Sequence, residues 1–275
     1  REEWSRYLNS VTGTDVRFGW IMDRLEADGL LEDTVVIFFS DNGRLMPRGI
    51  HWPFDEGLRV PMIIRWPKNH PAPPQIKAGK VSDQVVSLVD LTATTMAIAG
   101  IEKPLGMQSQ NFLGAKPDPA RTYAFAARDR IDETEVRMRS VHDDRYHYIR
   151  NFTPGAGFLT LNRYKEKCFA IKPLMREMHE AGELDGPPAD LMKPFADEML
   201  YDLKADPEEL VNLAGSDSAE HQAALVRMRT ALDVWMVETR DRGEIAESRE
   251  IVAPFLKEMH DWFVTPEWAA DQAPR

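Results

Sequence analysis

Two oxygen-bearing side chains, Asp41 and Asn42, follow one residue after the uninterrupted β-branched and aromatic run from Val35 to Phe39. A run of this kind without polar alternation is typical of a strand that is covered on both faces of an α/β sheet. In open α/β sheets, ligands bind beyond the carboxyl ends of the strands, which is where these two side chains fall. A carboxylate and an amide there would supply the hard oxygen ligands that suit a divalent cation such as Ca²⁺. The alternative is that the sequence from Asp41 to Gly43 is only a turn after the strand.

The overall charge restricts the classes of partner. The chain has 275 residues and a formal net charge of −11 at pH 7. Nucleic-acid binding rests on an excess of Lys and Arg, so no nucleic-acid partner is expected. An anionic substrate would need a metal ion or a local group of basic side chains to offset this field.

Cysteine content and hydropathy exclude further classes of site. Cys168 is the one cysteine, so an intramolecular disulfide and a multi-thiolate metal site are excluded. No run approaches the roughly 18 apolar residues of a membrane-spanning helix, so we expect a soluble protein without a membrane partner. Its location, in the cytoplasm or in the periplasm or outside the cell, stays open. The sequence starts within a predicted helix, so an upstream part is expected.

The elements that would position Asp41 and Asn42 follow from the spacing of apolar residues. Apolar side chains at helical steps predict a helix over 2–29 with one wide apolar face. A second buried strand is expected over 60–66. A further helix is expected to begin near Ser87 or Asp90 and to end at a glycine.

A proline-containing stretch from Lys116 to Ala120 predicts a boundary between two domains, over residues 1–116 and 121–275. Beyond it, β-forming residues predict a small antiparallel sheet. The expected strands are 122–126, 135–141, 146–151 and 198–203, and the expected helices are 174–182 and 219–240. The sequence Asp206-Pro-Glu-Glu209 is typical of a helix start, with proline in the first turn.

Several blocks of sequence in a fixed order carry a resemblance to a known family. The blocks are Ser40-Asp-Asn-Gly43, Pro47-Arg-Gly49, Phe54-Asp-Glu-Gly57, Leu58 to Pro67, Ser87 to Thr94, Arg128 to Asp132, Arg145 to Arg150 and Glu198 to Glu209. They resemble the type I sulfatases of the alkaline-phosphatase superfamily. The resemblance implies an α/β fold, an alkaline-phosphatase-like sandwich. Residues 1–116 would be the C-terminal part of its large sheet domain, and residues 121–275 a small C-terminal α+β subdomain with an antiparallel sheet and a tail.

The resemblance also implies which parts of the active site this sequence holds. The family's nucleophile is a formylglycine made from the cysteine of a CxPxR or CxAxR motif near the N-terminus. Cys168 lies in no such motif and is expected to be a structural thiol. The formylglycine and the first pair of aspartate ligands are therefore expected upstream, outside this sequence. The second pair, Asp41 and Asn42, carries over as ligands of one Ca²⁺ ion.

One departure from the family concerns sulfate binding. The family usually has a lysine four residues before the aromatic residue of its central block, and counting back from Phe54 gives Ile50 instead. Arg48 or His51 flanks that position and could supply the missing cation, as a catalytic or substrate-binding residue. The alternative is that Arg48 forms a surface ion pair and that His51 packs beside Trp52.

The sequence therefore predicts a fragment of a metal-dependent sulfatase, which hydrolyses sulfate esters and is inactive without its upstream nucleophile. Its expected partners are a sulfated small molecule or saccharide and the missing N-terminal half of the same protein. Two alternatives stay open. One is a phosphodiester or phosphonate monoester hydrolase of the same superfamily. This alternative gains support from Ile50, which stands where the family usually has its sulfate-binding lysine. The other is a non-catalytic half-domain that binds a partner.

Overall fold

The chain divides into two compact units in the computed structural model, which describes residues 2–160, 162–254 and 257. The first unit comprises residues 1–45 and 59–124, and the second comprises residues 46–58 and 125–275.

The loop over residues 46–58 is the main difference between these units and the predicted domains, 1–116 and 121–275. It belongs to the second unit because its side chains enter the core of that unit. Most of the predicted tail, beyond residue 254 and apart from Lys257, lies outside the described residues.

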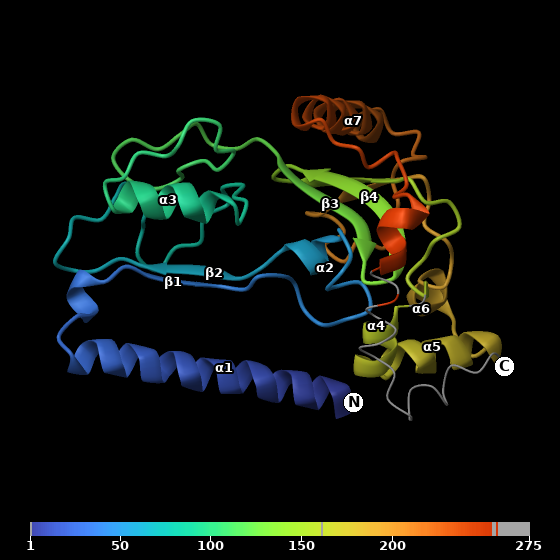
Figure 1. Cartoon of the computed structure of the whole chain (residues 1–275), viewed down its shortest axis with the longest axis horizontal. Coiled ribbons are helices and arrows are strands. Elements are labelled where there is room, and N and C mark those ends of the chain that lie inside the picture. Colours follow the sequence, from blue (N-terminus) through green and yellow to red (C-terminus); the bar gives the residue numbers. More distant parts are fainter. Residues whose placement is uncertain (1, 161, 255–256, 258–275) are drawn as a thin grey trace. The chain divides into compact units, whose positions relative to one another are not determined.

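In the first unit, a long helix packs on a two-stranded antiparallel sheet (Figure 1). Its elements in chain order are α1 (Glu2–Ala27), the 3-10 helix η1 (Leu31–Asp33), β1 (Val36–Phe39), β2 (Met62–Arg65) and α3 (Asp90–Ile98). Phe18 of α1 meets Phe38 of β1 edge to face, with ring centroids 5.4 Å apart. A buried carboxylate, Asp90, begins α3 and accepts two hydrogen bonds from Arg121. This ion pair ties the start of α3 to the end of the unit.

The second unit is built on a four-stranded sheet in the order β3-β4-β5-β6. Its strands are β3 (Ala124–Ile131), β4 (Thr134–His142), β5 (Tyr146–Asn151) and β6 (Glu198–Asp202), and its helices are α2 (Asp55–Leu58), α4 (Arg163–Cys168), α5 (Ile171–Glu180), α6 (Gly186–Asp190) and α7 (Ala219–Thr239). The pairs β4–β5 and β5–β6 are antiparallel. Helix α7 packs against β4 and β5 (Figure 1).

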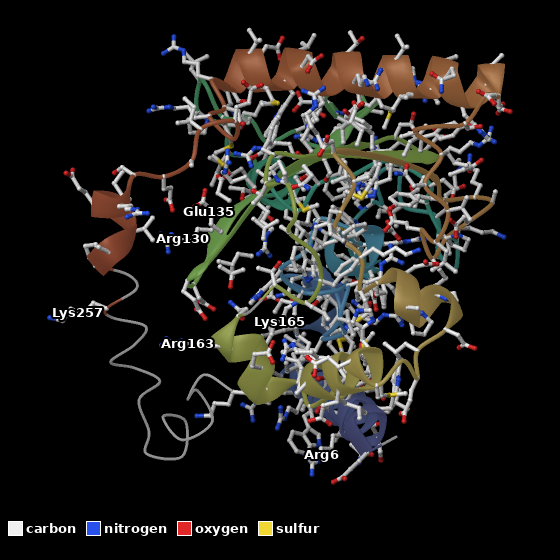
Figure 2. All side chains as sticks on the ribbon, turned by 90° about the vertical axis from the view of Figure 1, so that its right-hand side faces the viewer. Arg6, Arg130, Glu135, Arg163, Lys165 and Lys257 are labelled. Carbon is white, nitrogen blue, oxygen red and sulfur yellow. The ribbon has the colours of Figure 1, made fainter. Side chains whose placement is uncertain are left out.

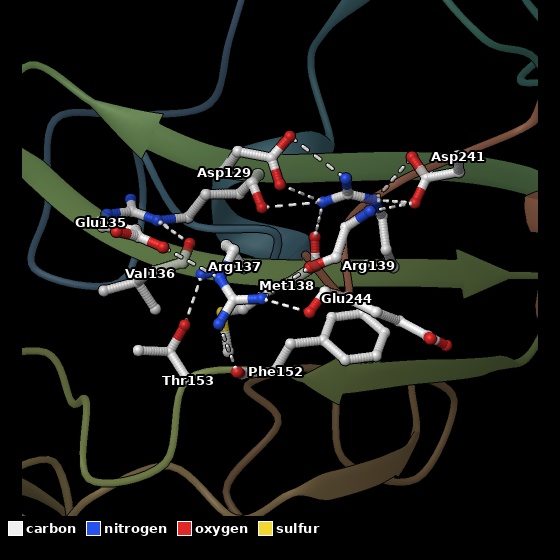
Figure 3. A network of polar contacts seen from close by, with 12 residues as sticks. Asp129, Glu135, Val136, Arg137, Met138, Arg139, Phe152, Thr153, Asp241 and Glu244 are labelled. Carbon is white, nitrogen blue, oxygen red and sulfur yellow. Dashed lines mark hydrogen bonds and ion pairs between the residues drawn. The ribbon is translucent and has the colours of Figure 1, made fainter. Parts of the chain in front are cut away.

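A buried arginine fixes the chain after α7 onto the sheet. Arg139 of β4 is 2% exposed at its side chain and bonds to Asp129 of β3 and Asp241 beyond α7 (Figure 3). Gly243 lies against the guanidinium, and a Cβ at that position would be 2.5 Å from Arg139 Cζ. Two carboxylates compensate the burial of this charge, as an interior cation requires.

Two aromatic residues of the 46–58 loop form part of the core of the second unit. Trp52 and Phe54 are 4% and 1% exposed and pack against Phe158 and Phe195. Gly57 allows the loop to close on itself, because a Cβ there would collide with the carbonyl oxygen of Trp52 and a second backbone oxygen. The hydrophobic side chains therefore hold the loop, and the glycine permits its close approach.

A buried group of charges, Arg48, Glu209 and His147, holds the same loop at its other side. Glu209 Oε1 lies 2.5 Å from His147 Nδ1, and its Oε2 accepts from the Asp55 N–H at 2.9 Å and lies 3.5 Å from Arg48 Nη2. Arg48 also donates to the carbonyl oxygens of Glu208 and Glu209. We call Arg48, Glu209 and His147 the anchor cluster.

The anchor cluster lowers the pKa of its carboxylate. Burial alone would raise the pKa of Glu209, but the charge and hydrogen bond of His147, the Asp55 N–H and the charge of Arg48 more than offset burial and lower it. The carboxylate thus stays ionised in the interior.

Sequence and structure agree on the fold class and differ in several local features. The α/β fold with a small antiparallel sheet is confirmed. The predicted helix start at Asp206 is wrong: this segment is a turn, because Glu209 takes a left-handed backbone (φ 51°) that directs its carboxylate into the core. The β1 strand is half-buried, with Phe39 47% exposed, although its sequence predicted burial on both faces. The apolar stripe of α1 is also largely exposed.

Gly57→Ala should destabilise the second unit by at least about 1–3 kcal/mol, because overpacking against backbone atoms leaves no flexible neighbour to move. Gly215→Ala in the same unit is the matched control, since a Cβ there meets nothing within 4 Å. Urea unfolding of both variants measures the effect. Equal stability of the two variants would contradict the observed packing of the loop.

Glu209→Gln should lower the free energy of unfolding at pH 7 by about 3–5 kcal/mol, because it leaves Arg48 and His147 buried without their carboxylate. A carboxylate whose folded pKa is lowered adds stability above its unfolded pKa, near 4.5, and loses it as the pH falls below that value. The variant should therefore lose less stability than the parent as the pH falls from about 5 through the unfolded pKa and on toward the lower folded pKa.

Glu208→Gln is the matched control, because the Glu208 side chain is exposed and contributes only its backbone carbonyl to the anchor cluster. Urea unfolding across this pH range should leave the control with the acid sensitivity of the parent. An equal loss of stability in both variants at pH 7 would refute the role given to Glu209.

Candidate functional site

The predicted metal ligands, Asp41 and Asn42, lie in the first unit directly beyond β1. Asp41 is exposed and Asn42 is half-buried. Asp41 Oδ1 accepts the Asn42 N–H at 3.0 Å, and Ser40 Oγ donates to the Asn42 carbonyl oxygen at 2.8 Å. These short-range bonds form a tight turn, and no described group bonds to the Asn42 side-chain amide. The structure thus shows the turn, and the role of Asp41 and Asn42 as metal ligands stays a prediction.

The chemistry of these two residues fits a hard cation in part. A carboxylate and an amide oxygen suit Ca²⁺, which takes about 6–8 oxygen ligands. Asp41 and Asn42 would supply only a minority of them. Among the described residues, no group of three or more His, Cys, Asp or Glu side chains could hold a metal ion. Further ligands would have to come from elsewhere, so the metal assignment stays a prediction.

The first candidate cation, Arg48, belongs to the anchor cluster of the second unit. Its side chain is 11% exposed and is engaged with Glu209 and with the carbonyl oxygens of residues 208 and 209. Its guanidinium also lies 4.9 Å from the centroid of the Phe54 ring. Its Nε is buried without a described partner. These contacts favour an anchoring role, and a contact with substrate stays a prediction.

The second candidate, His51, is half-buried and has an unusual backbone. Its φ angle is 80°, a left-handed conformation that non-glycine residues rarely adopt. Its ring lies 5.8 Å from that of Tyr164 on α4, at an interplanar angle of 35°. Burial, followed by the charges of Lys165, Arg128 and Lys172, lowers the pKa of His51 to about 4. The imidazole is therefore neutral at neutral pH.

Two further cations at this loop, Lys165 and Arg128, were not identified as site residues from the sequence. Lys165 of α4 donates to the carbonyl oxygen of Ile50, and Arg128 of β3 donates to that of His51. Figure 2 shows Lys165 on α4 beside Arg163. An ammonium group thus lies next to the backbone of residue 50, where the family usually carries lysine. Lys165 is 115 positions away in sequence, so no local pattern could have indicated this.

The surroundings of Lys165 and Arg128 are cationic and aromatic. Burial, then the charges of Lys172 and Arg128, lower the pKa of Lys165 to about 7, while Glu56 raises it. Burial lowers the pKa of Arg128 to about 10. Trp52 packs on both cations, and its buried indole N–H has no hydrogen-bond partner among the described residues. The arrangement could stabilise a negative charge placed near the loop.

Comparison with known proteins shows similarity to sulfatases along most of the chain. The sulfatase family model matches residues 2–101. An ulvan-active sulfatase of Formosa agariphila is 37% identical over 256 residues, which are 91% of this chain and 41% of that protein. The human N-sulphoglucosamine sulphohydrolase is 28% identical over 95% of this chain and 53% of its own length. The chain thus spans about two fifths to one half of these relatives.

Solved structures share the fold. A protein solved with its substrate D-glucosamine-2-N,6-O-disulfate superposes with a TM-score of 0.58 at 22% identity, over 88% of this chain and 42% of that chain. A 2-O GAG sulfatase gives a TM-score of 0.50 at 21% identity, over 76% of this chain and 37% of that chain.

In the part of the chain that the structure describes, no helix is long and apolar enough to cross a membrane.

The ordered blocks of the sequence, the α/β architecture and the similarity along most of the chain agree with one another. Along most of its length the chain is similar to sulfatases, and its fold is that of solved sulfatase structures.

Proposed function

We propose that the complete protein hydrolyses a sulfate ester in a metal-dependent reaction, and that this chain supplies the C-terminal part of the enzyme. The observation that carries the proposal is the oxygen pair Asp41 and Asn42 at the end of β1, in a chain related to sulfatases over most of its length. A nucleophile and further metal ligands would come from sequence outside this chain, so the chain alone would be inactive.

The exposed apolar surface of the first unit supports the view that this chain is part of a larger fold. Phe39 and Ile63, on the paired strands β1 and β2, are 47% and 62% exposed, and Trp20 of α1 is 65% exposed. Strands and helices with such sequences are normally covered. We infer that the missing N-terminal half of the same protein covers them and continues the sheet.

In the proposed mechanism, Asp41 and Asn42 would hold one Ca²⁺ ion through a carboxylate and an amide oxygen. The ion would supply neutralisation of negative charge on the transferring sulfate group. Such compensation is needed because the chain has a net charge of −11, which repels an anionic substrate. His51 would contact the substrate as a neutral imidazole, which donates or accepts one hydrogen bond at a time.

The proposed substrate class is a sulfated saccharide. The relatives include sulfatases named for ulvan and for N-acetylglucosamine 6-O-sulfate, and a structural neighbour holds a glucosamine disulfate. These names describe sulfate groups carried on sugars. The specific sugar and the position of its sulfate would depend on residues outside this chain as well as on the 46–58 loop.

In the complete natural protein, Asp41→Ala should reduce sulfate-ester turnover by at least about 100-fold, as loss of a charge-stabilising group typically does, and should weaken Ca²⁺ binding. Asp83→Ala is the matched control, because Asp83 is exposed in a loop of the same unit. Turnover of a chromogenic aryl sulfate and calorimetric titration with Ca²⁺ measure the two effects. Full activity in the Asp41 variant would refute the assignment, and faster turnover of a phosphonate monoester by the parent would favour that chemistry instead.

A further inference from the structure

His51 is held by two buried cations that bind successive backbone carbonyl groups. Lys165 donates to the carbonyl oxygen of Ile50, and Arg128 donates to the carbonyl oxygen of His51 itself. The two hydrogen bonds thus lie on either side of the residue whose φ angle is 80°. We call Lys165 and Arg128 the cation clamp.

The backbone of His51 needs such support. A non-glycine residue in this region is strained, and the strain persists only where the surrounding structure determines it. Two fixed donors on adjacent carbonyl groups leave the peptide planes before and after His51 little freedom to rotate. The clamp therefore accounts for the conformation by contacts that the structure shows.

The clamp lowers the stability of the fold, so a purely structural role does not account for it. Lys165 and Arg128 are 2% and 6% exposed. Among the described residues neither forms a salt bridge with a carboxylate, and the Glu56 charge that acts on Lys165 offsets its burial only in part. Trp52 offers partial compensation, since its ring centroid lies 4.1 Å from Arg128 Cζ and 5.5 Å from Lys165 Nζ. Burying charges without carboxylates destabilises a fold, and strained or charged arrangements of this kind cluster at functional sites.

A neighbouring buried lysine, Lys172, differs from the clamp residues because it forms a salt bridge with a carboxylate. Lys172 of α5 is 3% exposed, but its ammonium lies 3.2 Å from Glu166 and donates to the carbonyl oxygen of Thr160 at 3.1 Å. It forms a normal buried ion pair and does not bind the 46–58 loop. The absence of a described carboxylate partner is thus specific to the cations that contact the backbone of residues 50 and 51.

The charges around His51 also fix its protonation. Burial and the charges of Lys165, Arg128 and Lys172 all disfavour the imidazolium and keep the ring neutral at neutral pH. Tyr164 packs beside the ring. A neutral, oriented imidazole can donate from one nitrogen and accept at the other.

We propose that Lys165 and Arg128 are positioning residues, which hold the backbone of His51 in its left-handed conformation so that its imidazole contacts the sulfated ligand. The proposal rests on the proposed function in one respect, namely that the 46–58 loop faces the substrate. The clamp and its effect on His51 are independent of that assignment.

A titration of His51 in this chain by NMR tests the clamp directly. In Lys165→Met, the pKa of His51 should rise from about 4 toward its ordinary value of 6.5, because one of the neighbouring positive charges that lower it is removed. The backbone amide signals of residues 50–52 should also shift. Lys165→Arg should preserve both properties. Lys172→Met is the matched control: it removes a nearby charge, but it should leave the amide signals of residues 50–52 unchanged. A parental pKa and unchanged amide signals in Lys165→Met would overturn the proposal.

A comparison of His51→Gly with His51→Ala tests the strain without altering the clamp. Both substitutions remove the imidazole, but glycine adopts positive φ without the steric cost that alanine incurs. His51→Gly should therefore unfold at a higher temperature than His51→Ala, the reverse of the usual order in regular structure. A higher unfolding temperature for His51→Ala would show that the backbone is unstrained and would refute the role of the clamp.

Kinetics of the complete natural protein test the functional part. Lys165→Met should raise KM for a sulfated monosaccharide about tenfold, which corresponds to a loss of about 1.4 kcal/mol in binding, with a smaller change in kcat, and Lys165→Arg should restore KM. A parental KM in Lys165→Met would overturn the positioning role even if the titration shows the clamp. Absence of sulfate-ester turnover in the parent would instead refute the proposed function, and the titration and unfolding experiments would still decide whether the clamp exists.

Discussion

The burial of Glu209 between Arg48 and His147 is the constraint on which the arrangement of the second unit depends. A carboxylate in the interior is tolerated only when cations and hydrogen-bond donors surround it. Here the donors come from parts of the chain that are far apart in sequence, with His147 on β5 and Arg48 and the Asp55 N–H on the 46–58 loop. Satisfying this one charge therefore brings the loop onto the sheet.

The aromatic core and the cation clamp act on the loop that the anchor cluster holds. Trp52 and Phe54 fill the core, while Lys165 and Arg128 bind the backbone between Arg48 and Trp52. These contacts have opposite effects on the stability of the fold. Hydrophobic burial and the Glu209 cluster stabilise the fold, whereas two buried cations without a described carboxylate partner work against it. This contrast separates the parts of the loop that stabilise the fold from the part to which we assign ligand binding.

The first unit poses a different physical problem, because its strands and its long helix expose apolar side chains that their sequences suit for burial. Its described sheet has two strands, β1 and β2, and a two-stranded sheet is marginal by itself. The chain spans only part of the length of its relatives. The proposal that this chain is part of a larger sheet domain accounts for the exposed apolar surface of this short sheet, and Asp41 and Asn42 lie at one end of it.

Sequence by itself determined the fold class, the similarity to sulfatases and most of the regular elements. Apolar periodicity predicted α1, β1, β2, α3 and α7 closely, because local spacing decides which face of a helix or strand is apolar. The blocks around Asp41 and Phe54 were sufficient to indicate the sulfatase family. The metal role of Asp41 and Asn42 stays a prediction, since oxygen type and spacing suggest ligands but do not assemble them.

Tertiary structure alone decided how the loop after β1 is held. The pairs Arg48–Glu209 and Lys165–Ile50 join residues 161 and 115 positions apart, and no local pattern encodes such contacts. The segment at Asp206 illustrates the same limit. Its sequence favours a helix start, yet Glu209 has a left-handed backbone and its carboxylate lies in the core beside His147. Sequence fixes local propensity, whereas the energy of buried charge is settled only when distant parts of the chain meet.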